Sequence, residues 1–496
     1  MILFNKLSYV EVPHDAGDFS LMDKKVYLVI MSLSEETTIC AISTPPGRGS
    51  VGIIRVSGPK TSAISMKILG FKPEIRYAHT CQFLNQDQSV IDIGIAIFFE
   101  GPNSYTGEDT LELQCHGSLP LLNEILNRLL SLGAVIARPG EFTERSFLNG
   151  KMDLAQAEAV ADLIESGTEQ QAKSASRTLR GAFSDRIKKL QEQLTKTRIN
   201  VEAAIDFSDE DLELSSNETI LNLITKCLTD LDTVFTKAKQ GVIIKEGLQV
   251  VIAGYPNSGK STLLNAIAGE DAAIVTEIPG TTRDVLNVEV SVRGIPIKIT
   301  DTAGLRETND PVELEGVRRA QEAIMAADHI LFVVDITTLN NQPRNLRDVI
   351  TSFSDDFSLK LNSKKNLTIV VNKLDLIENY GFFTEELQAV DIQIPVIAIS
   401  AKTEEGLHNL RENFLKVSDH LCFNEDNFSA RTRHISALEV AKTHLNKAQK
   451  LAEESIDLEL IAEELRLSQL VMGSITGELT SDDLLGEIFG SFCVGK

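Results

Sequence analysis

The sequence contains no long apolar run, and none of its hydrophobic stretches approaches the roughly 20 apolar residues that a helix needs to span a bilayer. Positive charge is also scarce, because 48 lysines and arginines stand against 71 aspartates and glutamates, for a formal net charge of -23. This balance disfavours nonspecific attraction to nucleic acid or anionic lipid. It is compatible with a basic partner protein, or with a local basic patch such as Arg177, Arg180, Arg186, Lys188 and Lys189.

Closely spaced cysteines are also missing. The six cysteines are scattered along the chain, which disfavours a disulfide framework or a zinc site and favours a reducing compartment. The contents of 43% hydrophobic and 24% charged residues are those of an ordinary soluble protein, so we expect a cytoplasmic location. Only Cys493 stands apart, because it lies close to the C-terminus in the sequence Phe-Cys-Val-Gly-Lys.

Proline is absent from two long segments, one between Pro139 and Pro256 and one after Pro395. The first has apolar residues at helical spacing, and the second has a helical pattern from about His434 onward. A chain of 496 residues is too long for one core and should form about three domains. We therefore expect one discontinuous helical domain, with another domain inserted between its two parts.

Before Pro139 the pattern is one of short strands and turns with some helix. Strand-like segments cover residues 39–42, 51–56, 91–99 and 111–115, and residues 121–132 form an amphipathic helix pattern. These features predict an N-terminal α+β domain.

Residues 1–32 differ from the rest of the chain. They mix apolar and acidic residues, contain no arginine and lack the continuous apolar core of a signal peptide, and a transit peptide would be rich in arginine. We hypothesise that translation starts at Met31 or Met22. A native peptide covering Phe4 to Lys24, found by mass spectrometry, would refute this.

Residues 254–261 read Gly-Tyr-Pro-Asn-Ser-Gly-Lys-Ser, a complete phosphate-binding loop. The loop follows an apolar run, 250–253, and opens into a helical pattern. The glycines let successive backbone N–H groups curl around a phosphate, Lys260 reaches the β and γ oxygens, and Ser261 can hold Mg²⁺. This combination predicts a nucleotide-binding domain.

Four downstream segments indicate that the nucleotide is GTP. Residues 280–284 supply threonines for the metal and the γ-phosphate, and residues 301–304 read Asp-Thr-Ala-Gly after the strand pattern 295–299. Asn-Lys-Leu-Asp at 372–375 closes the strand 368–371, and its Asp375 can accept from guanine N1–H and the exocyclic amine. Ser-Ala-Lys at 400–402 follows the strand 396–399. Each segment alone is weak, but all of them in this order predict a GTPase.

One position departs from the Ras-like pattern. Leu305 stands where Ras-like proteins have the glutamine that orients the attacking water. Leucine can neither donate nor accept a hydrogen bond, so other groups must promote hydrolysis. The acidic residues that follow offer four candidates: Glu307, Asp310, Glu313 and Glu315. The pattern alone does not choose among them, and each is also typical of a solvated face.

Further segments outside the GTPase motifs complete a resemblance to a known family. They are residues 44–49 (Thr-Pro-Pro-Gly-Arg-Gly), 101–109 (Gly-Pro-Asn-Ser-Tyr-Thr-Gly-Glu-Asp), 138–143 (Arg-Pro-Gly-Glu-Phe-Thr) and 153–159 (Asp-Leu-Ala-Gln-Ala-Glu-Ala). With the GTPase motifs and the terminal Phe-Cys-Val-Gly-Lys, they make the chain resemble the MnmE (TrmE) family of tRNA modification GTPases from about Ile39 to Lys496. The family usually has isoleucine where Val494 stands, a conservative change, and residues 1–32 have no counterpart.

The resemblance implies a multidomain fold. An N-terminal α+β folate-binding and dimerisation domain would cover 33–150, a discontinuous all-helical domain 151–246 and 421–496, and an inserted Ras-like α/β P-loop GTPase domain 247–420. It also implies a homodimer that forms a heterotetramer with a FAD-dependent partner, MnmG. Together the two proteins would add an aminomethyl or carboxymethylaminomethyl group to C5 of the wobble uridine of certain tRNAs. A tetrahydrofolate derivative, 5,10-methylene-tetrahydrofolate or 5-formyl-tetrahydrofolate as a bound analogue, would bind as cofactor and supply the one-carbon unit.

The family's functional residues map onto named positions of this chain. The GTP positions are Asn257, Ser258, Gly259, Lys260, Ser261, Thr262, Thr276, Glu277, Ile278, Pro279, Gly280, Thr281, Thr282, Asp301, Thr302, Ala303, Gly304, Asn372, Lys373, Asp375, Ser400, Ala401 and Lys402. Magnesium would be held by Ser261 and Thr282, and potassium by Asn257, Thr276, Ile278 and Thr281. The folate positions are Arg55, Glu112, Lys151 and Lys496.

Two catalytic roles are implied by the same resemblance. Glu313 matches the glutamate that helps to position the attacking water, and potassium would act where an arginine finger acts in other GTPases. Cys493 matches a cysteine that is needed for tRNA modification but not for GTP hydrolysis. An exposed thiol near a lysine would have a lowered pKa, which keeps a chemical role open.

Two other functions compete with this interpretation. A ribosome-assembly GTPase acting as a non-enzymatic switch would share the GTPase motifs, but it would carry KH-like or second GTPase domains instead of the N-terminal domain and Cys-Val-Gly-Lys tail. A folate-binding aminomethyltransferase that has acquired a GTPase is largely contained in the resemblance.

Overall fold

The computed structural model describes residues 37–206, 217–271, 287–292, 295–301, 318, 322–325, 327–339, 346, 351, 367–377, 394–419, 427–454, 457–478 and 482–495. Its contacts divide the chain into two compact units. The first comprises Met1–Met152 with Ser481–Lys496, and the second Asp153–Thr480. Among the helices in the described ranges, none is both long and apolar enough to cross a membrane.

The first unit is built on a six-stranded mixed sheet with the order β3-β4-β5-β2-β1-β6. Its strands are β1 (Ile39–Ile42), β2 (Gly52–Ser57), β3 (His79–Leu84), β4 (Val90–Phe99), β5 (Thr110–Cys115) and β6 (Val135–Ile136). Only β6 is parallel to its neighbour, β1; the other pairs are antiparallel. One face packs on α2 (Thr61–Leu69) and α3 (Leu119–Ser131) in an apolar core.

Side-chain alternation along β2 assigns its residues to the two faces of this sheet. Ile54 and Val56 are fully buried in the core, whereas Arg55 between them points to the opposite face. A smaller apolar cluster that includes Phe142 lies on that side, and Phe142 belongs to α4 (Glu141–Leu148).

The C-terminal segment packs against this same unit. Helix α16 (Asp482–Gly490) contacts α4, and the ring of Phe489 lies 6.3 Å from that of Phe147. After α16, Val494 forms an antiparallel bridge with Pro139. Gly140, at a φ of +68°, leaves no room for a side chain, since an added Cβ would lie 2.5 Å from the carbonyl oxygen of Phe489.

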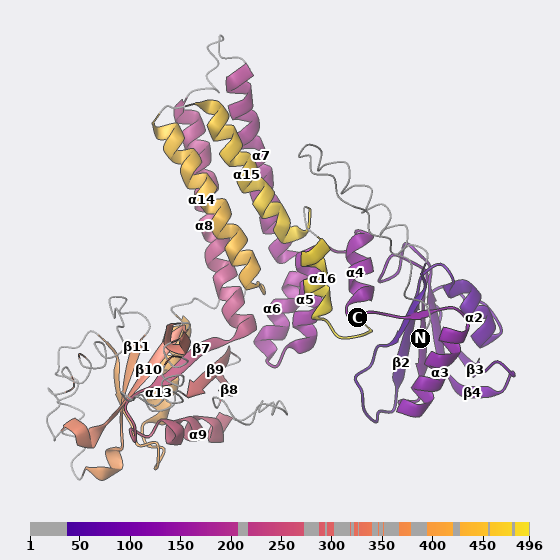
Figure 1. The fold of residues 1–496 in the computed structure, drawn as a ribbon, viewed down its shortest axis with the longest axis horizontal. Coiled ribbons are helices and arrows are strands. Elements are labelled where there is room, and N and C mark those ends of the chain that lie inside the picture. Colours follow the sequence, from indigo (N-terminus) through magenta and orange to yellow (C-terminus); the bar gives the residue numbers. More distant parts are fainter. Residues whose placement is uncertain are drawn as a thin grey trace, which may run out of the picture. The chain divides into compact units, whose positions relative to one another are not determined.

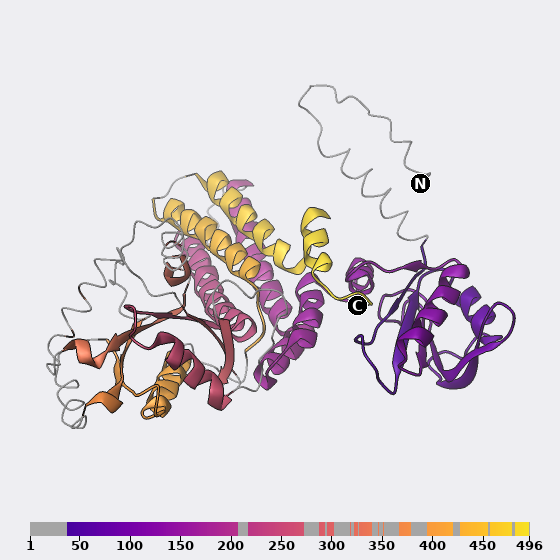
Figure 2. The ribbon, with the colours of Figure 1, turned by 60° about the horizontal axis from the view of Figure 1, so that its bottom comes forward.

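The second unit contains a helical bundle made from two distant parts of the sequence. Its helices are α5 (Leu154–Glu165), α6 (Glu169–Leu179), α7 (Ala182–Asp206), α8 (Asn217–Glu246), α14 (Thr432–Glu453) and α15 (Leu458–Thr476). Helices α14 and α15 pack against α8 and α7, as Figures 1 and 2 show from two directions. Capping boxes fix the starts of α5 and α6, each by a reciprocal pair of hydrogen bonds.

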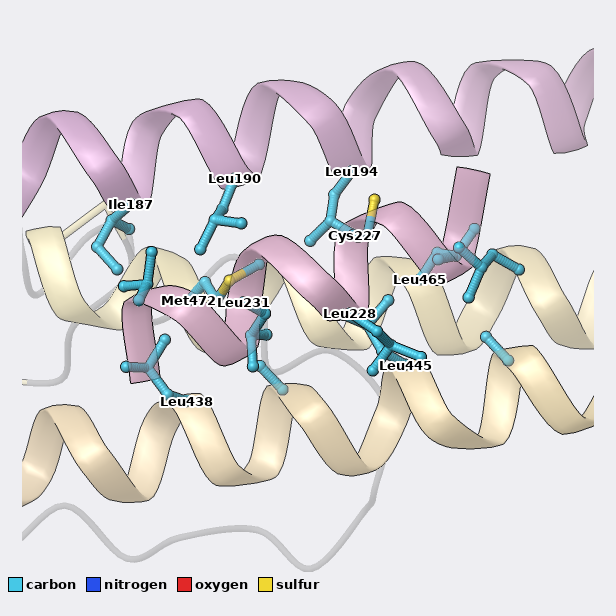
Figure 3. Packing of buried hydrophobic residues seen from close by; sticks show 14 of the residues in the cluster. Ile187, Leu190, Leu194, Cys227, Leu228, Leu231, Leu438, Leu445, Leu465 and Met472 are labelled. Atoms are coloured by element: carbon cyan, nitrogen blue, oxygen red, sulfur yellow. The ribbon is translucent and has the colours of Figure 1, made fainter. Parts of the chain in front are cut away.

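One continuous apolar core joins the two parts of this bundle. Ile187, Leu190 and Leu194 of α7 lie at helical spacing and point toward Leu465 and Met472 of α15 and the residues of α8 (Figure 3). All five of these side chains are buried. The expected discontinuous helical domain is thus confirmed.

A buried charge cluster lies where the bundle meets the inserted domain. Glu158 of α5 is 1% exposed and binds Arg433 through both oxygens, with Nε–Oε1 2.7 Å and Nη2–Oε2 2.9 Å. The ring Nε2 of His434 lies 2.9 Å from Glu158 Oε2. One turn further along α5, Asp162 Oδ1 lies 2.8 Å from Arg431 Nη2 and 3.3 Å from Lys245 Nζ. Lys245 and Arg431 flank the insertion, so a single carboxylate contacts both of its ends.

The inserted domain has a second six-stranded sheet, with the order β12-β11-β10-β7-β9-β8. Its strands are β7 (Leu248–Ala253), β8 (Asn287–Val292), β9 (Ile295–Asp301), β10 (His329–Asp335), β11 (Leu367–Asn372) and β12 (Val396–Ala398). All pairings are parallel except that of β8 with β9. Helices α9 (Lys260–Asp271) and α13 (Leu407–Asp419) contribute to its apolar core. The α/β fold expected for a P-loop GTPase domain is confirmed.

Candidate functional site

The phosphate-binding loop lies at the point where the second sheet reverses its strand order. In the sheet, β7 is flanked by β9 and then β8 on one side, and by β10, β11 and β12 on the other. Ligands of open α/β sheets bind beside the carboxyl ends of strands at such a reversal. The loop after Ala253, the end of β10 at Asp335 and the end of β11 at Asn372 all meet there.

Backbone geometry explains the glycines of this loop. Gly254 has a φ of +155°, and a Cβ added to it would lie 2.4 Å from the carbonyl oxygen of Val333 on the neighbouring strand. Gly259 has a φ of +92°, and a Cβ there would lie 2.3 Å from Asn372 Nδ2. Asn257 also adopts the left-handed region, with a φ of +64°. The loop therefore curls tightly back on itself before α9 begins at Lys260.

Lys260 is held inside the curl of the loop. Its side chain is buried, at 7% exposure, and Nζ donates to the carbonyl oxygens of Gly254 and Tyr255, both at 3.1 Å. The ammonium group is thereby fixed at the N-terminus of α9, where the helix dipole favours a bound anion.

Asn372 ties three of the predicted motifs together. It is 2% exposed, its Nδ2 donates to the carbonyl oxygen of Ser258 at 3.0 Å, and its Oδ1 accepts from the backbone N–H of Ala401 at 2.9 Å. The phosphate-binding loop, the Asn-Lys-Leu-Asp motif and the Ser-Ala-Lys motif are thus joined by one buried amide.

The carboxylate predicted to recognise guanine is fixed from one side. Ser400 is fully buried and its hydroxyl donates to Asp375 Oδ1 at 2.7 Å. The same hydroxyl oxygen accepts from the backbone N–H of Thr403 at 3.2 Å, which sets its direction. Asp375 Oδ2 is the oxygen that these bonds do not engage. The predicted residues Asn372, Asp375, Ser400 and Ala401 therefore form one cluster with the loop.

Sequence reasoning missed one residue of this cluster, Asp335. Its Oδ2 lies 2.6 Å from Lys373 Nζ, and its Oδ1 accepts from the backbone N–H and the hydroxyl of Thr337 at 2.9 and 2.8 Å. An Asp-x-Thr sequence at the end of an apolar run is typical of a side chain that caps the turn after a strand, and that signal could have found it.

Several predicted residues lie outside the part of the chain that the structure describes. They are Thr276, Glu277, Ile278, Pro279, Gly280, Thr281, Thr282, Thr302, Ala303, Gly304, Glu313 and Lys496, together with Leu305. Asp301 is placed by its backbone, which ends β9 opposite Ile252 of β7. Ser261 and Thr262 lie in α9, and Lys402 lies after β12, all within the part of the chain that the structure describes.

A second group of predicted residues lies in the first unit. Arg55 and Glu112 are directly opposed on β2 and β5, and Glu112 Oε1 accepts from Arg55 Nε at 3.0 Å and from Nη2 at 2.8 Å. The guanidinium lies 5.3 Å from the ring centre of Tyr105 and 5.7 Å from that of Phe142. This arrangement gives a charged pair between two aromatic side chains on the face opposite the core.

Of the other predicted folate positions, Lys151 lies in the described part of the chain. Lys151 Nζ donates to the carbonyl oxygen of Pro102 at 2.8 Å. The C-terminal segment approaches from the side of β1, because a Cβ added to Gly495 would lie 2.4 Å from the carbonyl oxygen of Ile42. Cys493 is exposed and carries a free thiol, and its carbonyl oxygen accepts from the N–H of Gly140 at 3.4 Å.

Family models match both the N-terminal part and the rest of the chain. Residues 38–151 match the family model of the GTP-binding protein TrmE N-terminus, and residues 154–493 match that of the MnmE helical domain. The chain is 49% identical to the tRNA modification GTPase MnmE of Shewanella frigidimarina over 460 residues, covering 92% of this chain and 99% of that protein. It is 48% identical to the MnmE of Shewanella woodyi over 461 residues, with the same coverage. Among solved structures, the G domain of the T. maritima FeoB iron transporter aligns with 34% of this chain and 98% of its own, at 23% identity and a TM-score of 0.24.

Proposed function

Since the chain belongs to the MnmE family of tRNA modification GTPases, we propose that it drives one specific modification, the addition of an aminomethyl or carboxymethylaminomethyl group to C5 of the wobble uridine. The proposed reaction uses a tetrahydrofolate one-carbon donor, a FAD-dependent partner of the MnmG type and potassium-dependent GTP hydrolysis. A GTP hydrolase acting in tRNA modification follows from the family itself. The finer assignments are our proposal. The convergence of three GTPase motifs on Asn372 supports its nucleotide-binding part most directly.

In the proposed nucleotide site the loop N–H groups and Lys260 bind the phosphates. Lys260 already sits at the N-terminus of α9, and it needs only to exchange its two carbonyl contacts for phosphate oxygens. Ser261 and Thr282 would hold Mg²⁺, which neutralises charge between the β and γ phosphates. Asp375 would accept from the guanine N1–H and exocyclic amine, because Oδ2 is not engaged by Ser400 and Oδ1, which accepts one bond from Ser400, keeps a second lone pair.

We propose that potassium and Glu313 replace the glutamine that Leu305 cannot supply. Asn257 fits a cation site, because its left-handed backbone lies in the phosphate loop and its amide carries a hard oxygen ligand. Thr276, Ile278 and Thr281 would complete the site. Wild-type protein should hydrolyse GTP faster in K⁺ than in Na⁺ at equal ionic strength, and equal rates would refute the potassium site. Glu313→Ala should lower kcat severely with little change in GTP affinity.

The folate donor is assigned to the first unit. The Arg55–Glu112 pair fits such a ligand, since a carboxylate suits the N–H groups of a pterin, a guanidinium suits its glutamate tail, and Tyr105 and Phe142 provide ring faces. Lys151 and Lys496 would add positive charge for the tail. Glu112→Gln should therefore weaken tetrahydrofolate binding, measured by calorimetry, while GTP hydrolysis stays at the wild-type rate.

The remaining assignments concern assembly and chemistry. We propose that the domain at 33–150 forms a homodimer, that the domain at 247–420 is the GTPase and that the helical parts at 151–246 and 421–496 link the two in the cytoplasm. Cys493 would contribute to modification and not to hydrolysis, which agrees with its exposed position in the first unit. Cys493→Ser should abolish modification at an unchanged rate of GTP hydrolysis.

The decisive experiment is mass spectrometry of wobble uridines. A strain lacking the gene should lose the C5 modification, and the wild-type chain should restore it, whereas Cys493→Ser should not. If the tRNA of the deletion strain keeps its C5 groups, the proposed modification is wrong and a purely regulatory GTPase is favoured.

A further inference from the structure

The Asp335–Lys373 pair lies beside the predicted guanine site, and its carboxylate, Asp335, has no role in the proposal above. Asp335 ends β10 and Lys373 follows β11, so the two meet at the carboxyl edge of neighbouring parallel strands. The ammonium lies 2.6 Å from Asp335 Oδ2, and both side chains are mostly buried, at 15% and 29% exposure.

The carboxylate of Asp335 is held on both oxygens. Oδ1 accepts two hydrogen bonds from Thr337 and Oδ2 accepts from Lys373, so the side chain cannot rotate without losing all three bonds. Burial alone would raise the pKa of Asp335, but the hydrogen bonds from Lys373 and Thr337 outweigh it and lower the pKa below its usual value. Asp335 therefore stays ionised at neutral pH as a fixed acceptor.

The backbone of Lys373 is fixed as well. It adopts the left-handed region, with a φ of +72°, and the N–H of Leu374 donates to the carbonyl oxygen of Ile399 at 3.2 Å. With its backbone and its ammonium both anchored, the four-carbon stem between them has little freedom. That stem begins two residues before Asp375, the residue proposed to bind the edge of guanine.

We propose that Asp335 is a positioning residue for nucleotide binding: it holds Lys373 so that the lysine stem packs against one face of the guanine ring. A planar base gains apolar contact with a lysine stem when the charged head is solvated or paired elsewhere. Asp335 supplies that pairing. It also keeps the ammonium of Lys373 away from the phosphates, which Lys260 would bind. This inference rests on the guanine site proposed above.

The test compares two carboxylates that bracket the same strand. Asp335→Asn removes the charge but keeps an acceptor for Thr337. Asp328→Asn is the matched control, because Asp328 lies just before β10, at the opposite edge of the sheet, where it accepts from the N–H of Gln249 at 2.9 Å. Titration of the full chain with a fluorescent N-methylanthraniloyl GDP should show a Kd about tenfold higher for Asp335→Asn, because the freed lysine stem must then be ordered when the nucleotide binds. Asp328→Asn should leave the Kd unchanged.

A double-mutant cycle separates positioning from general stability. Lys373→Ala should weaken GDP binding, and adding Asp335→Asn to it should cause no further loss, because the two residues act as one unit. In steady state, Asp335→Asn should raise KM for GTP about tenfold and leave kcat within about twofold. An Asp335→Asn effect of equal size in the Lys373→Ala background would overturn the proposal, and so would an unchanged Kd.

Different results would refute the guanine site and the positioning role of Asp335. If the wild-type chain binds GDP no better than ADP, the guanine site itself is wrong. If the wild-type chain prefers GDP and Asp335→Asn binds it equally well, only the positioning role is wrong.

Discussion

Replacing Glu158 by glutamine should destabilise the helical bundle strongly, although the side chain keeps its shape. Glu158 is 1% exposed and accepts two hydrogen bonds from Arg433, with His434 at 2.9 Å and Arg431 Nη1 at 3.8 Å. Glutamine removes the charge that Arg433 and Arg431 need and turns an N–H₂ group toward another donor. Removing one partner of a buried ion pair costs about 3–5 kcal/mol.

Two measurements can detect this loss of stability. For a unit of roughly 150–250 residues, 1 kcal/mol shifts Tm by about 2–4 °C, so thermal unfolding followed by circular dichroism should shift by about 6–20 °C. Hydrogen exchange followed by mass spectrometry isolates the bundle, and peptides of α5 and of the start of α14 should lose most of the protection. Glu165→Gln on the exposed end of the same helix is the control, with an expected change within about 0.5 kcal/mol. Equal stability of the two variants would refute the reasoning.

Acidification should act on the same cluster. Burial opposes ionisation of Glu158, but its contacts with His434 and Arg433 outweigh burial and lower its pKa, while burial lowers the pKa of His434. Both groups then bind fewer protons in the folded state than in the unfolded chain, where His titrates near about 6.5 and Glu near about 4.3. Stability is therefore full above about pH 6.5 and falls as the pH is lowered, and the Glu158 part of this slope should vanish in Glu158→Gln.

Three further predictions concern other parts of the molecule. Gly259→Ala should weaken GDP binding by at least about 100-fold, because its Cβ would lie 2.3 Å from Asn372 Nδ2. Gly269→Ala in α9, with nothing within 4 Å of the added Cβ, should bind GDP normally and be more stable by about 0.5–1 kcal/mol. Similar GDP titrations of the two variants would contradict this. Burial lowers the pKa of His329 to about 4, so this histidine contributes about 3 kcal/mol of folding stability above pH 6.5 that is lost toward pH 4. His329→Gln should remove this pH dependence from the urea midpoints measured between pH 6.5 and pH 4. Gly140→Ala should make the C-terminal segment more susceptible to proteases, because its Cβ would meet the carbonyl oxygen of Phe489. Gly150→Ala, at a similar φ of +66° but with open space around it, should leave proteolysis unchanged. Equal cleavage of the two variants would argue against the clash.

Much of the inserted domain could be predicted from sequence because its signals are local. The strands expected at 250–253, 295–299, 368–371 and 396–399 correspond to β7, β9, β11 and β12. Each is an apolar run followed directly by a polar motif, since the parallel strands are buried on both faces and the motifs lie at their carboxyl ends. The helix expected at 121–132 is α3, for the equivalent reason that its apolar face repeats at helical spacing.

What escaped prediction depends on contacts between distant residues. Strand β6 has only Val135 and Ile136, both exposed, and exists through its pairing with β1. Strand β3 buries only Phe83 fully, so its alternation is weak. The Asp335–Lys373 pair joins two strands across the sheet, and the partners of Glu158 come from the far side of the insertion. Residue types alone do not reveal such pairs.

The divided bundle has a consequence for how the protein is made. Helices α7 and α8 pack against α15 and α14, which are synthesised only after the whole inserted domain. At about 5–20 residues per second, the apolar faces of α7 and α8 wait on the order of 10–60 seconds for their partners. During that interval Ile187, Leu190 and Leu194, buried in the finished protein, have no native cover from α15. The GTPase domain can fold in this time because its strands are consecutive in sequence, so the nascent chain passes through a stage with a folded nucleotide site and an open, aggregation-prone helical half.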